Sequence, residues 1–274
     1  MRIRHKRGGF INLGVSNYKT PINKRPSTLT KPIVGLPNFL WCVPRSISTA
    51  FEKMMGNTGQ FNVISEPFID IYKQGIISPN DFESAQAQFN TFFDSLRHNN
   101  QCQPIFVKDM AYHATPFILD RQIKSAKHTF LIRDPSLSIP SLYRMRGDFH
   151  ENETGFEGQR VLFDKIHRVT GIKPFIINAD QLIQTPAQVV KQYFAYIDHR
   201  MPSHALTWES GARDNWKGRE PWHIDAINSR GFTDNKRSIN REKMPPRVEA
   251  LIKQNMSYYE YMCEQLLQQE QHFK

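Results

Sequence analysis

The sequence is poor in cysteine, which limits the kinds of site it can build. Its three cysteines, Cys42, Cys102 and Cys263, are odd in number and show no paired spacing. They therefore indicate neither a disulfide framework nor a zinc site, and no other cluster of metal ligands is evident in the sequence. Free thiols favour a reducing compartment, so we expect a cytoplasmic protein that uses no metal.

Long apolar runs are missing too, and so are acidic residues near the N-terminus. No stretch approaches the roughly 18 apolar residues of a membrane-spanning helix, and the N-terminus has no apolar signal-like core, so we expect no membrane partner. Residues 1–37 hold eight of the 36 Lys and Arg residues and none of the 26 Asp and Glu residues. The net charge of +10 is thus concentrated at one end, which argues against a nucleic-acid partner. We expect residues 1–37 to form a basic arm, either solvated or wrapped over the domain, and residues 38–274 to form a single domain.

Strand and helix patterns alternate from residue 39 onward. The strand candidates are Phe39–Val43, Phe61–Ser65, Ile105–Lys108, Thr129–Arg133 and Pro174–Asn178. The helical patterns are Ser48–Met55, Phe82–Arg97, Pro116–Lys124, Gln159–Val169, Ala187–Ile197 and Pro245–Gln269. This alternation predicts an α/β fold of three layers (αβα), with helices on both faces of a central parallel sheet. Ligands bind beyond the carboxyl ends of such strands, where Arg45, Glu66, Lys108 and Arg133 fall.

The most informative segment is residues 39–52. An apolar strand runs into Pro44-Arg45-Ser46-Ile47-Ser48-Thr49, and a helical pattern follows at once. Such a turn aims backbone N–H groups and the positive end of a helix dipole at one point, so it can hold a doubly charged anion beside Arg45. The alternative is that Ser48 or Thr49 only caps the helix. The turn lacks the G-x-x-x-x-G-K-[ST] pattern, which argues against an ATP or GTP site.

The strand followed by Pro-Arg-Ser-x-Ser-Thr resembles the 5′-phosphosulfate-binding loop of the sulfotransferase family. The resemblance implies a P-loop-like sulfotransferase fold. It also implies the donor 3′-phosphoadenosine 5′-phosphosulfate (PAPS), with 3′,5′-adenosine bisphosphate as the product and no metal. By this resemblance, the residues that bind the 5′ end of the donor are Arg45, Ser46, Ile47, Ser48 and Thr49.

A second motif resembles the 3′-phosphate site of the same family. The β-rich run at 128–132 ends in Arg133-Asp134-Pro135, and Ser141 lies eight residues after the arginine. An arginine binds phosphate oxygens in a bidentate manner, and Ser141 would add a hydroxyl donor from the following helix. The alternative is a surface ion pair between Arg133 and Asp134.

Further matches follow in chain order, so that the resemblance covers about residues 38–265. Ser65-Glu66-Pro67-Phe68 and the Trp-rich segment 208–232 resemble elements of a bacterial branch of the family. Lys108 matches the lysine of the Lys-Thr-His strand in the cytosolic branch, whereas Asp109 and Met110 replace the threonine and the histidine. The usual catalytic histidine is therefore absent from that position.

The resemblance implies in-line sulfuryl transfer to a small-molecule acceptor, at a hydroxyl or at an amine or carbamoyl nitrogen. Arg45, Lys108 and the amides of the loop would stabilise the leaving phosphate. Glu66 is our first candidate for the general base, although burial would have to raise its pKa for that role. His113 is the second candidate, because histidine titrates near neutrality. The alternatives are that Glu66 only pairs with Arg45 and that His113 only caps a helix.

An aromatic side chain is expected to stack on the adenine. The tryptophan that follows the loop in the cytosolic branch is replaced here by Ala50. We therefore expect Trp216 or Phe232 to supply the stack, with Arg230 as a second contact to the 3′-phosphate. Packing in the core or in a loop is the alternative for all of them.

The acceptor is less well indicated. Four acidic residues gather after the second motif, at Asp148, Glu151, Glu153 and Glu157. They suggest a cationic acceptor, for example a guanidinium natural product such as a saxitoxin-like alkaloid, whereas a hydrated surface loop explains them more simply. Two other functions stay open, namely a P-loop-type kinase or nucleotide phosphotransferase and a non-catalytic nucleotide-binding protein. Nothing in the sequence indicates the oligomeric state.

Overall fold

The fold is built on one parallel sheet. The computed structural model describes residues 35–78, 81–99, 103–218, 220–232 and 244–272, so that nearly all of the expected basic arm lies outside the described residues. The strands are β1 (Asn38–Cys42), β2 (Asn62–Ser65), β3 (Ile105–Met110), β4 (Lys127–Ile132) and β5 (Phe175–Asn178). Their order in the sheet is β2-β3-β1-β4-β5, and every neighbouring pair is parallel. The central strand is therefore β1, the strand that precedes the expected anion-binding loop.

Helices occupy most of the connections between these strands. Those before β4 are α1 (Ser48–Asn57), α2 (Ile69–Tyr72), the π-helix η1 (Lys73–Ile77), α3 (Phe82–Asn99), α4 (Ala111–Ala114) and α5 (Asp120–Ile123). Those after β4 are α6 (Pro135–Met145), the 3₁₀-helix η3 (Glu151–Thr154), α7 (Phe156–Thr170), α8 (Ala179–Gln184), α9 (Pro186–Tyr196), the 3₁₀-helix η4 (Asp214–Trp216), α10 (Glu220–Asn228) and α11 (Pro246–His272).

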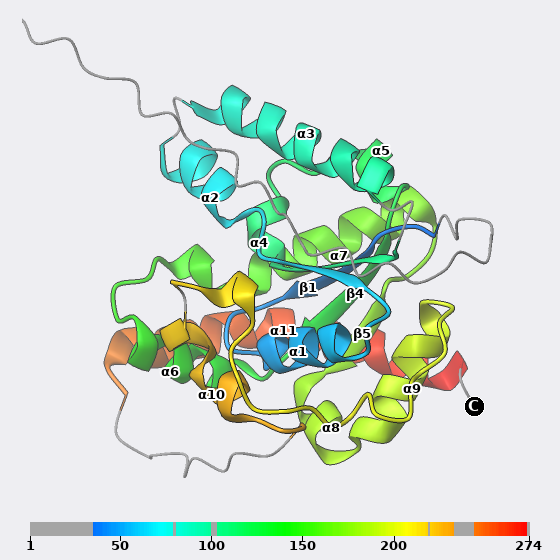
Figure 1. The fold of residues 1–274 in the computed structure, drawn as a ribbon. Helices are drawn as coiled ribbons and strands as arrows, with labels where there is room; N and C mark the ends of the chain where they lie inside the picture. The colour runs from blue at the N-terminus through cyan, green and yellow to red at the C-terminus, as the bar shows by residue number, and fades with distance from the viewer. Residues whose placement is uncertain (1–34, 79–80, 100–102, 219, 233–243, 273–274) are drawn as a thin grey trace, which may run out of the picture. The chain divides into compact units, whose positions relative to one another are not determined.

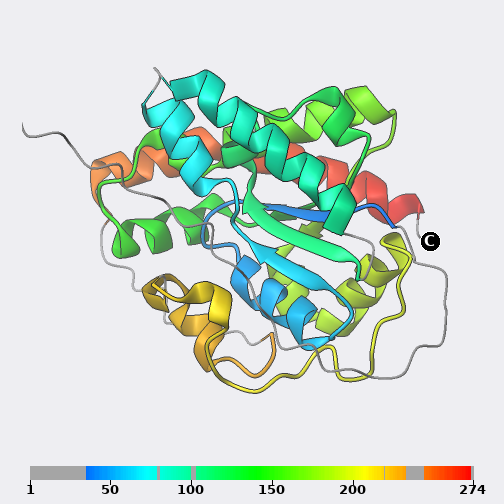
Figure 2. The ribbon, with the colours of Figure 1, turned by 45° about the horizontal axis from the view of Figure 1, so that its top comes forward.

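The side chains of β1 face two apolar cores in alternation. Phe39 and Trp41 join the core that includes residues of α3, α7 and α11, whereas Leu40 and Cys42 join the core that includes residues of α1 and α9. Successive side chains of a strand point to opposite faces, so a strand that is apolar throughout has to be covered on both sides. Figures 1 and 2 show helices on each side of the sheet. The three-layer αβα prediction is confirmed.

Some boundaries differ from those expected. β3 runs on through Asp109 and Met110, both buried, instead of ending at Lys108. The helix expected from Pro116 is confined to α5, because Leu119 has extended backbone angles and interrupts the helical path. α7 begins three residues before the expected start, directly after Gly155, whose positive φ of 83° sets the entry of the chain into the helix.

All five strands run in the same direction, so their carboxyl ends lie along one edge of the sheet. At this edge Ser65 of β2 pairs in register with Lys108 of β3, and Cys42 of β1 pairs with Met110 of β3 and Leu131 of β4. The segments that follow β1, β2, β3 and β4 are therefore brought together although they are far apart in the sequence.

Candidate active site

The loop between β1 and α1 is held in an uncommon conformation. Arg45 and Ile47 have φ angles of 59° and 61°, in the left-handed region that residues other than glycine rarely adopt. The Ser46 side chain is fully buried, and its hydroxyl donates a hydrogen bond of 2.7 Å to the carbonyl of Val43. Ile47 is the N-cap residue of α1, so neither Ser48 nor Thr49 serves as a helix cap. The strained turn and the N-terminus of the ten-residue helix together form a geometry suited to an anion.

Arg45, Arg133 and Ser141 meet beside this loop. The Nη1 atom of Arg133 donates to the backbone carbonyl of Arg45 at 2.5 Å, and the Nε atom of Arg45 donates to the Ser141 hydroxyl at 3.0 Å. Asp134 does not pair with Arg133; instead it caps α6 by accepting a hydrogen bond from the N–H of Ser136. The structure thus brings together the residues that the sequence assigned to the two ends of the donor.

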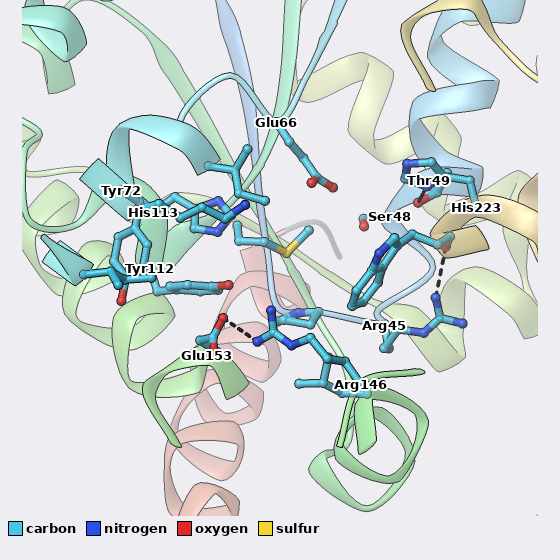
Figure 3. A pocket seen from close by; sticks show the side chains of 17 residues that line it. Arg45, Ser48, Thr49, Glu66, Tyr72, Tyr112, His113, Arg146, Glu153 and His223 are labelled. Atoms are coloured by element: carbon cyan, nitrogen blue, oxygen red, sulfur yellow. Dashed lines mark hydrogen bonds and ion pairs between the residues drawn. The ribbon is translucent and has the colours of Figure 1, made fainter. Parts of the chain in front are cut away.

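A cavity of about 350 Å³ opens at the carboxyl edge of the sheet. Of the residues expected from the sequence, Arg45, Ser48, Thr49, Glu66 and His113 line it. Figure 3 shows Glu66 at one end of the cavity, His113 on one side with two tyrosines, and Thr49 on the opposite side. The residues that the sequence reasoning missed include Tyr72, Tyr112, Arg146, Trp222 and His223.

Glu66 belongs to a buried charge network under the cavity. Its carboxylate accepts a hydrogen bond of 2.5 Å from the Lys108 ammonium, which also lies 3.3 Å from the fully buried carboxylate of Glu52. Glu52 in turn accepts hydrogen bonds from the Ser65 hydroxyl and from the indole N–H of Trp216. Lys108 is fully buried and does not line the cavity, so it acts here as the partner of two carboxylates.

This network fixes the protonation states of the pair. Burial raises the pKa of Glu66, but the charge and hydrogen bond of Lys108, with smaller contributions from His113 and His223, outweigh that effect and hold the pKa at about 2. Burial lowers the pKa of Lys108, but the neighbouring carboxylates of Glu66 and Glu52 raise it by more than burial lowers it. The pKa of Lys108 therefore stands above its ordinary value. Both groups are therefore charged at neutral pH, and the partner of Glu66 is Lys108.

His113 lines the cavity wall and pairs with the fully buried Asp109. The Nδ1 atom of His113 lies 2.7 Å from Asp109 Oδ1, and the Asp109 carboxylate also accepts hydrogen bonds from the N–H groups of Phe68 and Met110. A carboxylate accepts hydrogen bonds, so Nδ1 carries a proton and Nε2 is the nitrogen that is able to take one. His113, the third residue of α4, thus supplies an imidazole to the cavity. The position at which the resemblance would lead one to expect a histidine is occupied by Met110.

Helix α10 lies against the loop between β1 and α1. The Nη1 atom of Arg45 donates to the carbonyl of Trp222 at 3.1 Å, and its Nη2 atom pairs with Asp225 at 3.3 Å. His223 Nδ1 lies 3.2 Å from the Thr49 hydroxyl. In the sequence, the Trp-rich segment 208–232 had indicated that this part of the chain belongs to the site. It did not indicate which of its side chains line the cavity.

Trp216 and Phe232, expected to stack on the adenine, and Arg230, expected to contact the 3′-phosphate, lie outside the lining of this cavity, as do Arg133 and Ser141. Trp216 is fully buried, with its N–H on Glu52 and its ring 5.0 Å from that of His223. Phe232 packs edge-on against Trp208, and the exposed Arg230 accepts a hydrogen bond from Trp208 through its backbone carbonyl. None of the three lines the cavity, whereas Trp222 does and is 38% exposed.

The acidic residues of the loop after α6 are largely engaged with one arginine. Glu153 and Asp148 both pair with Arg146, and of the four acidic residues only Glu153 lines the cavity. Glu151 and Glu157 are exposed. The placement supports the simpler alternative of a hydrated loop, except at Glu153.

Within the described ranges, no group of three or more His, Cys, Asp or Glu side chains is arranged to hold a metal ion. None of the helices in the part of the chain that the structure describes is both long and apolar enough to cross a membrane.

The fold and the site define a P-loop-like α/β protein of the group-transfer type. The chain belongs to the sulfotransferase family, because it matches the sulfotransferase domain over residues 37–265. Sulfuryl transfer is the general activity of this class.

A solved structure of a sulfotransferase domain agrees with this fold, and two further sulfotransferase structures were found with lower scores. The sulfotransferase domain of the Synechococcus PCC 7002 olefin synthase superposes with a TM-score of 0.52 at 16% identity, covering 86% of this chain and 99% of that one. The sulfotransferase domain from the curacin biosynthetic pathway gives a TM-score of 0.43 at 16% identity, with 80% and 98% coverage. A sulfotransferase from Alicyclobacillus acidocaldarius gives 0.44 at 11% identity, with 84% and 96% coverage. A search of curated proteins found no match.

Proposed function

We propose that the protein transfers the sulfuryl group of PAPS to a hydroxyl group of a small-molecule acceptor. The observation that carries the proposal is the cluster of Arg45, Arg133 and Ser141 beside a strained anion-binding loop. PAPS carries a phosphate at one end and a phosphosulfate at the other, so a donor site needs cations and N–H groups for both. His113 lines the cavity together with Arg45, Ser48 and Thr49, and its Nδ1 atom lies 2.7 Å from the buried Asp109, which supports His113 as the proton acceptor.

The residues fit an in-line transfer. The acceptor oxygen forms a bond to sulfur while the bond from sulfur to the bridging phosphate oxygen breaks, and the electron pair stays on the phosphate. Arg45 and the N–H groups at the start of α1 stabilise that developing charge. His113 Nε2 takes the proton of the acceptor hydroxyl, and Asp109 holds the imidazole in the required tautomer and orientation.

His113 is the better candidate for the base on this geometry. A carboxylate with a pKa of about 2 is a weak proton acceptor at neutral pH, and Glu66 is already paired with Lys108. Glu66 instead contributes to the shape of the site, since it keeps the Lys108 charge in place. The placement of the acidic loop residues does not favour a guanidinium alkaloid as the acceptor.

A label-transfer assay tests the proposal. We expect ³⁵S to pass from labelled PAPS to a hydroxyl acceptor without added metal, and we expect His113→Asn to lower kcat by about 100-fold or more with little change in affinity for 3′,5′-adenosine bisphosphate. His204→Asn, a change at an exposed histidine, is the matched control and is expected to act like the wild type.

Two results would contradict the proposal. Mg²⁺-dependent transfer of phosphate from ATP would favour the kinase alternative. Tight binding of the bisphosphate without label transfer to any member of a panel of alcohols and phenols would favour the non-catalytic one.

A further inference from the structure

Arg146 and Glu153 form an ion pair in the wall of the cavity. Arg146 Nη2 lies 2.5 Å from Glu153 Oε1, and the other oxygen of Glu153 accepts a hydrogen bond of 2.7 Å from the N–H of His150. Both side chains line the cavity, and the Glu153 side chain is only 14% exposed. Asp148 lies 3.5 Å from Arg146 on the outer side and is 87% exposed, so solvent screens it. Figure 3 shows the pair across the cavity from Glu66 and next to Tyr112.

The remaining walls near this pair are neutral. Ile69, Met110 and Leu142 are apolar, and Tyr72 and Tyr112 present aromatic rings. Burial raises the pKa of both tyrosines, and Glu153 raises it further, so the phenols keep their protons at neutral pH. Lys73, at the rim, is 55% exposed and lies 3.8 Å from Asp70.

Each carboxylate that faces the cavity therefore already has a cation beside it. Glu66 has Lys108, and Glu153 has Arg146. A cationic acceptor would lose its hydration in the cavity, would find both carboxylates already paired, and would be repelled by Arg146. An anionic acceptor would likewise find Arg146 already paired and would be repelled by Glu153. Removing a charge from water without a new partner is unfavourable, and a neutral molecule avoids this penalty.

We infer that the Arg146–Glu153 pair determines the charge of the acceptor, so that the cavity selects a neutral hydroxyl compound with an apolar body over cationic and anionic compounds. This inference rests on the proposed sulfuryl transfer to a hydroxyl group, and it assigns to the two residues a role in specificity and none in the chemical step.

Three phenols that share one ring test it. Tyrosol is neutral, tyramine is a cation and 4-hydroxyphenylacetate is an anion at pH 7. Binding to the full chain in the presence of 3′,5′-adenosine bisphosphate is measured by isothermal titration calorimetry. We expect the wild type to bind tyrosol about tenfold more tightly than either charged phenol.

The variants reverse this preference in opposite directions. Arg146→Gln frees Glu153 and is expected to make tyramine the tightest ligand, whereas Glu153→Gln frees Arg146 and is expected to favour 4-hydroxyphenylacetate. The double variant has neither charge and is expected to restore the preference for tyrosol, which also shows that the single variants do not act through misfolding.

The outcomes separate this inference from the proposed function. The same ranking in all four proteins, a wild-type preference for a charged phenol, or no binding of tyrosol would overturn the inference. If Arg146→Gln instead weakens binding of 3′,5′-adenosine bisphosphate by itself, Arg146 belongs to the donor site and the inference is wrong. Failure of the bisphosphate to bind to the wild type would count against the proposed function.

Discussion

Glu66 and Lys108 are joined twice, by a backbone hydrogen bond and by an ion pair between their side chains. The N–H of Glu66 donates to the carbonyl of Lys108, and the side chains meet at 2.5 Å. Glu66 has a φ of 45°, so the chain adopts an unfavourable conformation to bring the carboxylate into place. The pair therefore stabilises the carboxyl edge of the sheet at the point where the cavity begins.

The low pKa of Glu66 predicts a loss of stability in acid. A carboxyl group with a pKa of about 2 in the folded protein and about 4.3 when unfolded stabilises the fold fully above about pH 4.5, and this contribution is lost as the pH falls through 2. We expect the difference in unfolding free energy between the wild type and Glu66→Gln to shrink by about 2 kcal/mol between pH 6 and pH 2.5. Urea denaturation at several pH values measures it.

An exposed carboxylate provides the comparison for this experiment. Glu264 is exposed on α11, and Glu264→Gln is expected to track the wild type across the whole range. A constant difference between the wild type and Glu66→Gln would show that the pairing with Lys108 does not depress the pKa in the folded protein.

At the scale of single residues, the sequence was most informative where a motif fixes the local backbone. The segment 44–49 follows a strand and opens a helix, so its place at the sheet edge follows from the order of the chain. Lys108 was placed correctly in a strand, although two residues before its end, and its role was not predictable, because Glu52 becomes its neighbour only when α1 packs on the sheet. Trp216 and Trp222 are six residues apart, and only the packing of α10 decides which of them reaches the cavity.

At the scale of the elements, one lysine of α1 binds the C-terminal end of α10. The ammonium group of Lys53 donates to the carbonyls of Ala226 at 2.8 Å, Ile227 at 3.1 Å and Ser229 at 3.3 Å. These carbonyls lie at the C-terminal end of α10, where a positive charge is favourable. Because α10 also contacts Arg45, Lys53 couples the end of this helix to the loop between β1 and α1.

We expect Lys53→Met to loosen α10 selectively. Losing the cation and its hydrogen bonds should cost about 1–2 kcal/mol in the local stability of the helix, so the amides of residues 222–228 should exchange about tenfold faster. Hydrogen exchange followed by mass spectrometry measures this. Lys53→Arg keeps a cationic donor and should recover most of the protection, and unchanged exchange in Lys53→Met would mean that α10 is held mainly by its other contacts.

Element prediction succeeded where periodicity was long and failed where tertiary contacts set the ends. The strands were located from their apolar runs, and α3, α9 and α11 from helical spacing. The short elements α4 and α8 and the π-helix η1 were missed, because each spans six residues or fewer and carries no complete period. The end of β3 was misjudged because Asp109 is a poor strand residue until its carboxylate finds the N–H groups of Phe68 and Met110.

For the whole molecule, the proposed donor site predicts stabilisation by the product nucleotide. A ligand that binds only the folded state at 100 times its Kd adds about 2.7 kcal/mol of stability, which corresponds to a rise in Tm of about 5–10 °C for a domain of this size. We expect 3′,5′-adenosine bisphosphate to give this shift with or without EDTA, and 5′-AMP to give a smaller one because it lacks the 3′-phosphate. Differential scanning fluorimetry measures both.

The comparison between nucleotides also examines Arg133. Arg133→Ala is expected to remove the advantage of the bisphosphate over 5′-AMP, whereas Arg133→Lys should retain part of it. Equal shifts for both nucleotides in the wild type would contradict the assignment of Arg133 and Ser141 to the 3′-phosphate.

The cavity draws its two halves from different parts of the chain. The loop after the central strand, together with α6 and α10, lines one half, whereas the opposite wall comes from α2, η1, α4 and η3. Ile71 and Tyr72 belong to the apolar core, so it is the exposed positions of these short segments that tolerate substitution. If the proposed function holds, changes at the exposed positions of residues 69–77 and 146–153 would alter which compound is modified and would leave the half around the loop after β1 unchanged.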